Sequence, residues 1–148
     1  ERVGIESIRA KSCAALCGGD IELARELATD DGDQMRSEAG RIVGCALRGV
    51  SGRERPWEGV ITRAQAAGEL TEQRMLGELA EAVEAFPAGR EKTAAQKEGE
   101  QAAHRAARRV RAESLEKSLR ICSLLLRDIA AAAGGAADQI MAVDRAGS

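Results

Sequence analysis

The chain has 148 residues, enough for one domain or for part of one domain joined to a second. Apolar residues make up 44% of it, but Trp57 and Phe86 are its only aromatic residues, so helices packed through Ala, Leu, Ile and Val are favoured over a pleated sheet. Charged residues nearly cancel to a net charge of −2, which excludes a strong overall attraction to nucleic acid or to an acidic membrane.

The N-terminal residues carry no targeting pattern. Residues 1–19 lack the order of charged, apolar and small residues of a signal peptide, and no run of about eighteen apolar residues predicts a membrane span. The sequence therefore predicts a cytoplasmic location and no membrane contact. Because it begins with Glu1 instead of Met, we expect an upstream part of a longer protein to precede it.

Two short helices are predicted first, joined by Gly18-Gly19. Residues 5–17 carry apolar side chains at helical spacing, and the two glycines end that helix. Asp20 is placed to cap the second helix. The apolar face of this second helix consists of Ile21, Ala24, Leu27 and Ala28. The polar cluster at residues 29–33 predicts a boundary before the next helix.

Three further helices are expected before residue 90. The third runs from about residue 33 to residue 47. Its expected buried side chains are Met35, Ala39, Ile42, Val43 and Ala46. Pro56 suits the first turn of a fourth helix, which Gly68 would close. Thr71 is placed as the cap of a fifth helix that ends at residues 86–89. Its apolar stripe is Met75, Leu76, Leu79, Ala80 and Val83.

One long helix is expected from residue 90 to residue 133, because this stretch has no Pro and only Gly99 as a place for a bend. Small and apolar side chains recur in it at steps of four and three, as in a seam between helices, at Leu115, Leu119, Cys122, Leu126, Ile129 and Ala133. The residues expected in a core or subunit interface are Leu115, Leu119, Cys122, Leu126, Arg127, Asp128 and Ile129. Gly134-Gly135 ends the helix, and residues 136–143 predict a short last one. The predicted fold is therefore all-α, a helical bundle with one long helix near the C-terminus.

The four cysteines allow two interpretations, disulfides or buried thiols, besides a metal site. They are Cys13, Cys17, Cys45 and Cys122. A structural zinc site needs four ligands, usually in close Cys or His pairs, and the single His104 is distant from Cys13 and Cys17. Buried reduced thiols that act as small apolar residues are favoured.

Catalytic chemistry finds no support in the sequence. Gly18-Gly19 before a helix start could cradle a phosphate, but Asp20 and Glu22 place negative charge there, so a capping role is favoured. His104 has no carboxylate or nucleophile beside it in the sequence. We expect no catalytic residue, no cofactor, no bound metal and no small-molecule substrate.

A basic stripe is the strongest candidate for nucleic-acid contact. It consists of Arg105, Arg108, Arg109 and Arg111. Such a stripe can bind phosphates, but the pI of about 5.6 and the lack of nearby aromatic residues favour a solvated or partner-facing stripe. We expect DNA contact to be indirect or weak at most.

Two segments carry a resemblance to a known family. Residues 17–28, CGGDIELARELA, are similar to a segment in the small helical lid of clamp-loader ATPase subunits. Residues 108–129, followed by Gly135 and residues 143–145, resemble the last long helix and the terminal helix of the delta-prime subunit of bacterial DNA polymerase III. Together they span nearly the whole chain in the order that this subunit has.

The resemblance implies a module that does not hydrolyse ATP. ATP-hydrolysing members carry a nucleotide-sensing Arg at the position of Glu22, and an acidic residue cannot hold a triphosphate. It further implies that residues 1–31 are the end of the lid domain and residues 32–148 the collar domain. The implied partners are the other clamp-loader subunits, and the implied function is to help load the sliding clamp in DNA replication.

A different class of function uses the same apolar stripes. They would form a homodimer seam in a self-associating helical adaptor or in the effector-binding domain of a transcription regulator. An enzyme would need an acid–base pair that the sequence does not show.

Overall fold

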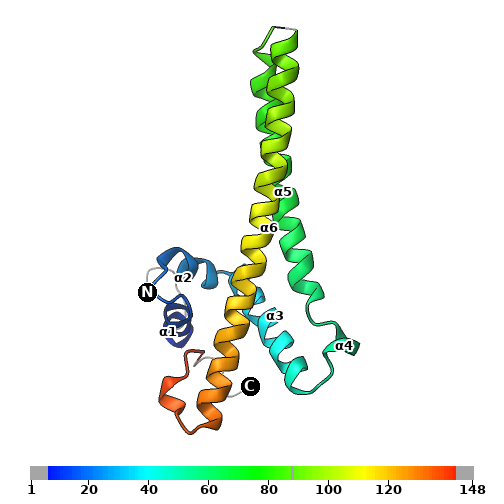
Figure 1. The fold of residues 1–148 in the computed structure, drawn as a ribbon. Coiled ribbons are helices and arrows are strands. Elements are labelled where there is room, and N and C mark those ends of the chain that lie inside the picture. The colour runs from blue at the N-terminus through cyan, green and yellow to red at the C-terminus, as the bar shows by residue number, and fades with distance from the viewer. Residues whose placement is uncertain (1–6, 88, 143–148) are drawn as a thin grey trace. The chain divides into compact units, whose positions relative to one another are not determined.

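Every regular element that the structure describes is helical. The computed structural model describes residues 7–87 and 89–142 (Figure 1). Its helices are α1 (Ser7–Leu16), α2 (Ile21–Leu27), α3 (Asp30–Leu47), α4 (Ser51–Glu54), α5 (Glu58–Glu84), α6 (Arg90–Ala133) and a last 3-10 turn, η1 (Ala137–Gln139). The predicted all-α class is confirmed. Within these two ranges no helix combines the length and the apolar character that crossing a membrane requires.

The helices form two compact units, and α6 contributes to both. The first, which we call the core unit, contains the described residues up to Val60 and those from Lys117 onward. The second, which we call the hairpin unit, is Ile61–Glu116. The boundary at residue 31 between lid and collar comes from the resemblance and stays a prediction.

The core unit buries one apolar cluster drawn from four helices. In Figure 1 the helices α1, α2 and α3 lie around the orange C-terminal part of α6. The members of the cluster are Cys13, Leu16, Cys17, Leu23, Leu27, Met35, Ala39, Val43, Ile121 and Cys122. Burial of such side chains is the main favourable term for folding, at about 25 cal/mol for each Å² of apolar surface.

Caps and a glycine define the sharp corner between α2 and α3. The Asp20 carboxylate accepts a hydrogen bond from the Leu23 N–H at 3.0 Å, as expected for the cap of α2. Thr29 caps α3 in the same way through the Gly32 N–H at 3.1 Å, so α3 begins at Asp30, earlier than expected. A Cβ at position 32 would overlap the backbone at the end of α2, so only Gly permits this corner.

Two of the expected apolar faces were displaced by one or two residues. In α2 the buried side chains are Leu23 and Leu27, whereas Ile21 is 68% exposed. In α3 the Cys45 side chain is buried and that of Ala46 is exposed. Both helices expose some apolar side chains, so hydrophobicity alone did not identify which side faces the core.

The prediction of two helices on either side of Gly68 is wrong. Helix α5 runs without a break from Glu58 to Glu84. Thr71 does not cap a helix, because its hydroxyl donates to the Ala67 carbonyl 2.9 Å away, one turn earlier in the same helix. Gly68 is buried, and a Cβ there would meet the Arg111 side chain and lie 3.0 Å from the Ala107 carbonyl oxygen. Gly68 therefore serves close packing of α5 against α6.

Helix α6 has the bounds that the sequence predicts, and within the hairpin unit it runs antiparallel to α5 (Figure 1). It is continuous through Gly99, where a Cβ would overlap the Leu79 side chain of α5. Ala103 and Ala107 are also buried. Small residues on α6 thus let the two helices approach closely at these positions.

The remaining connections differ modestly from expectation. Residues 51–54 form a short helix, α4, that was not predicted. Pro56 lies in the turn before α5, which begins two residues later. The last predicted helix, residues 136–143, is reduced to the three residues of η1, and Val143 lies outside the described residues.

Candidate functional site

The C-terminal half of α6 has two apolar faces, of which only one is used by the core unit. Ile121 and Cys122 are buried in the apolar cluster with residues of α1–α3. On a neighbouring face Leu119 is 63%, Leu126 47% and Ile129 39% exposed. These three residues, which we call the exposed ridge, project on one side because helical residues seven and three apart share a face.

A groove between α3 and α6 borders this ridge. It has a volume of about 580 Å³, and Ile129 lines it as well as belonging to the ridge. We call it the α3–α6 groove; its main lining residues are Gly40, Val43, Leu47, Leu125, Ile129 and Ala132, with Ile140 and Ala142 at the C-terminal end. Leu47 is among the strongly exposed apolar residues. A groove of this kind accepts the apolar face of a helix.

Gly40 explains why the groove is open. A Cβ at this position would meet no atom within 4 Å, so the space beside the helix is free. Gly44 lies one turn further along the same side of α3. The spacing of these two glycines is the sequence feature that could have located the groove, because small residues four apart let a second helix approach closely.

Arg127 and Asp128 have a structural role within the chain. Asp128 is buried, and one of its oxygens accepts the backbone N–H groups of Met141 and Ala142 at 3.0 and 2.8 Å. Arg127 donates to the other oxygen at 2.9 Å and to the Gln139 carbonyl at 3.0 Å. The pair thereby holds the segment after α6 against the helix and completes one wall of the groove.

The seven predicted core or interface residues therefore divide into three groups. Leu119, Leu126 and Ile129 form the exposed ridge, and Leu115, in the hairpin unit, is also partly exposed. Cys122 is a core residue whose thiol lies 3.8 Å from the Ala39 carbonyl oxygen. The third group is the Arg127 and Asp128 pair. The sequence pattern did not separate these roles, and the interface role of the exposed residues stays a prediction.

Two basic residues that no sequence pattern singled out hold α6 to the N-terminal helices of the core unit. Lys117 forms an ion pair with Glu26 of α2 at 2.6 Å. Arg120 donates to the Cys17 carbonyl at 3.0 Å, beyond the end of α1. Both contacts join residues about ninety or more positions apart, so no local pattern could have found them.

All four cysteines are buried and free. Burial raises the pKa of the Cys122 thiol. A hydrogen bond to Glu54 at 3.1 Å, together with burial, raises the pKa of the Cys45 thiol. Both effects favour the unreactive thiol form over the nucleophilic thiolate.

The four arginines of the predicted basic stripe do not all face solvent in the hairpin unit. Arg105, Arg108 and Arg109 are exposed on α6, whereas Arg111 turns toward α5 and lies 3.9 Å from Glu72. His104, which has no carboxylate beside it in the sequence, forms a 2.7 Å pair with Glu72 through Nδ1. This pair joins α5 to α6 at the surface of the hairpin.

Within residues 7–87 and 89–142 no group of three or more His, Cys, Asp or Glu side chains could hold a metal ion. Glu22, at the position where the resemblance implies a nucleotide-sensing Arg in ATPases, is exposed in the first turn of α2. The described residues also carry two exposed surfaces, one apolar and one basic.

Comparison with known proteins adds no assignment: no family model, no curated protein and no solved structure matches the chain.

Proposed function

We propose that the chain is a non-catalytic helical module that assembles a larger complex by binding a partner helix. The α3–α6 groove with the exposed ridge beside it carries this proposal. Large apolar side chains at the surface, arranged along one helix and next to an apolar groove, are typical of protein interfaces. Leu119, Leu126 and Ile129 would be covered by the partner.

The specific complex that we propose is a bacterial clamp loader. The chain would be the C-terminal part of a delta-prime subunit, and the occupant of the groove would be a helix from a neighbouring subunit. The resemblance of residues 17–28 and 108–129 to that subunit supports this assignment, and the module would then contribute to loading the sliding clamp in DNA replication. The lack of an Arg at the position of Glu22 supports a subunit that does not hydrolyse ATP.

The second candidate function is a self-associating adaptor or the effector-binding domain of a transcription regulator. The same exposed ridge favours it, because a C2 dimer can place one surface against its copy. Sedimentation velocity of the chain alone separates the two candidates. A monomer over the micromolar range agrees with the clamp-loader proposal, and a tight dimer agrees with the alternative.

Filling the groove tests the proposed surface directly. Gly40→Leu puts a side chain into space that is empty, and Leu is a better helix former than Gly, so we expect the fold to keep or gain stability. A bound partner helix and the Leu side chain would compete for the same space. We expect the full-length protein that contains this chain to leave the complex when it carries Gly40→Leu. Native mass spectrometry of the reconstituted loader measures this loss.

Gly77→Leu is the matched control, because Gly77 is an exposed helical glycine of α5 at which a Cβ would meet no atom within 4 Å. It should enter the complex as the wild type does. Incorporation of both variants at wild-type levels would contradict the proposed surface. A wild-type homodimer that Gly40→Leu dissociates would replace the clamp-loader proposal with the alternative.

A further inference from the structure

The outward face of α6 in the hairpin unit is mostly basic. Ala95, Gly99, Ala103 and Ala107 turn toward α5. The positions opposite them, which we call the basic face, recur at steps of four and three and are all exposed: Arg90, Ala94, Lys97, Gln101, Arg105, Arg108 and Ala112. Residues at this spacing share one side of a helix. The face therefore has four cations, and two exposed carboxylates, Glu91 and Glu98, lie along the edge that Arg105 occupies.

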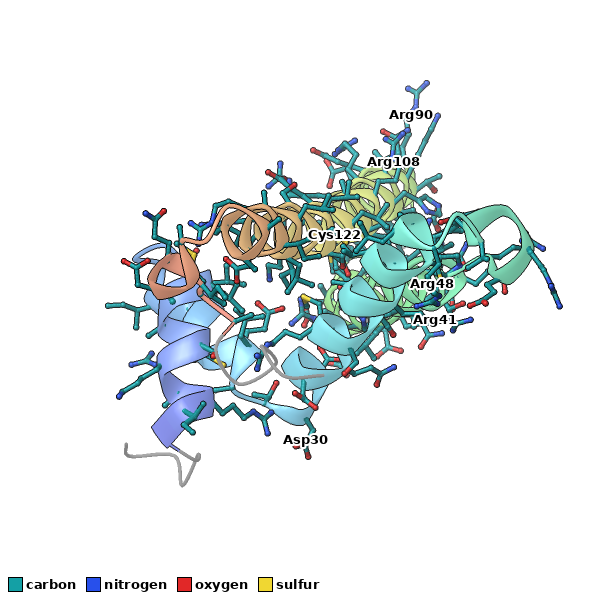
Figure 2. The ribbon with its side chains drawn as sticks, turned by 90° about the horizontal axis from the view of Figure 1, so that it is seen from below. Asp30, Arg41, Arg48, Arg90, Arg108 and Cys122 are labelled. Carbon is teal, nitrogen blue, oxygen red and sulfur yellow. The ribbon has the colours of Figure 1, made fainter. Side chains whose placement is uncertain are left out.

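The cations of this face are available for a ligand. The four cations make no ion pair and no side-chain hydrogen bond with any residue that the structure describes. They are Arg90, Lys97, Arg105 and Arg108. Figure 2 looks nearly along α6 and shows Arg90 and Arg108 extending on the same side of the helix. They are about five turns apart, or about 27 Å at about 1.5 Å per residue, so the basic face is a long, straight row.

The outward face of α5 provides an internal comparison. Positions at the same spacing there are Thr62, Ala66, Glu69, Gln73, Gly77, Ala80 and Glu84, with two carboxylates and no cation. The hairpin is therefore electrically asymmetric, although the whole chain has a net charge of only −2. General solubility needs no such separation of charge between two helices.

The chemistry of the basic face favours phosphates over a protein partner. Protein interfaces depend on aromatic or large apolar anchors, and this face has none. Phosphate contact needs only cations and hydrogen-bond donors, which Arg, Lys and Gln supply. Single-stranded nucleic acid is usually held by stacking on aromatic rings. Trp57 and Phe86, the only aromatic residues, lie outside α6.

We infer that the basic face of α6 contacts the phosphate backbone of double-stranded nucleic acid without reading its sequence. A duplex offers about one negative charge per 1.7 Å of its axis, so several phosphates lie within the length of the row. Arg105 and Arg108 form the densest part of the row and Lys97 and Arg90 extend it. The inference concerns the hairpin unit alone. Its test is therefore independent of the test of the apolar docking surface in the core unit.

Salt-dependent binding provides the test. Fluorescence anisotropy of the 148-residue chain with a labelled 20-base-pair duplex should show binding at low salt. Each neutralised phosphate contributes about −0.9 to the slope of log affinity against log salt, so four contacts give roughly −3 to −4. The triple variant Lys97→Gln, Arg105→Gln, Arg108→Gln should lose about one unit of slope for each cation and at least about tenfold in affinity at low salt.

The triple variant Arg25→Gln, Arg53→Gln, Arg74→Gln removes the same charge from exposed positions elsewhere and serves as the control. It should keep the wild-type slope, and circular dichroism should show both variants folded. The same titration with duplex DNA and with duplex RNA of equal length shows which nucleic acid the chain binds more tightly.

Three outcomes would overturn the inference. The first is no binding to either duplex at low salt with up to about 100 μM protein, where non-specific binders are already engaged. The second is an equal loss of slope in both triple variants. The third is tighter binding to the separated single strands. Loss of a homodimer in the Lys97, Arg105 and Arg108 variant, without a change in duplex binding, would instead assign the basic face to the acidic α5 face of a second copy.

Discussion

Single side chains in this protein act through contacts that are distant in the sequence. Asp128 is the clearest example, because a buried carboxylate must find partners or leave its charge uncompensated. It accepts two backbone N–H groups and the Arg127 guanidinium, and these contacts attach the last described residues to α6. Charge and burial together give this residue its structural importance.

Replacing Asp128 with Ala tests that role. The variant loses hydrogen bonds to a charged acceptor and leaves the Met141 and Ala142 N–H groups without their partner. We expect the free energy of unfolding to fall by about 2 to 4 kcal/mol, measured by urea denaturation followed by circular dichroism. Asp138→Ala is the control, because this exposed carboxylate should contribute less than about 0.5 kcal/mol. Equal effects of the two changes would show that the Asp128 contacts stabilise the fold no more than an exposed carboxylate does.

At the scale of single elements, small residues determine how closely α5 and α6 approach each other in the hairpin unit. Gly68 on α5 and Gly99 on α6 each occupy a point where a Cβ would overlap the opposite helix. In sequence patterns a glycine usually indicates a helix end, and for that reason Gly68 was wrongly expected to end one. The close approach of α6 leaves little room for a larger side chain at this position, although glycine inside a helix costs about 1 kcal/mol relative to Ala.

Gly68→Val tests the close approach of α5 and α6. The larger side chain would collide with Arg111 and with the Ala107 carbonyl, so we expect a loss of about 1 to 3 kcal/mol. Gly77→Val, in the same helix but facing open space, should be neutral or raise the melting temperature. Thermal unfolding followed by circular dichroism compares the two. If both variants change the melting temperature alike, the packing role of Gly68 is wrong.

At the scale of the whole molecule, each unit presents a surface that its own fold does not use. The core unit leaves the ridge of Leu119, Leu126 and Ile129 uncovered, and the hairpin unit leaves the basic face unpaired. Exposed apolar surface of this kind often marks an interaction site, which is the basis of the proposed assembly role.

Leu119→Asp separates assembly from folding. Since Leu119 is mostly exposed in this chain, we expect the free energy of unfolding to change by less than about 0.5 kcal/mol. In the proposed complex the carboxylate would be buried without a partner, so binding should weaken at least about tenfold. Leu70→Asp, at an equally exposed position on α5, should leave assembly unchanged. Sedimentation of each variant with the loader subunits measures the difference, and unfolding by Leu119→Asp would show that this side chain belongs to the core.

Sequence alone determined the fold class and the bounds of α6. A stretch without proline, rich in Ala and with apolar residues every three to four positions, has no stable alternative to a helix. Local capping chemistry was likewise readable, as Asp20 shows. The face of α6 that carries Leu119 and Leu126 was also recognisable as apolar, because periodicity depends only on spacing along one helix.

Tertiary structure decided how those faces are used. Whether Leu119 or Ile121 is buried depends on where α1, α2 and α3 pack, and these helices are far from α6 in the sequence. The burial of Arg36 in the core, and the roles of Gly68 and Asp128, depend on the same long-range packing. The physical reason is that helix formation is set by neighbouring residues, whereas burial is set by partners that the chain brings together only on folding.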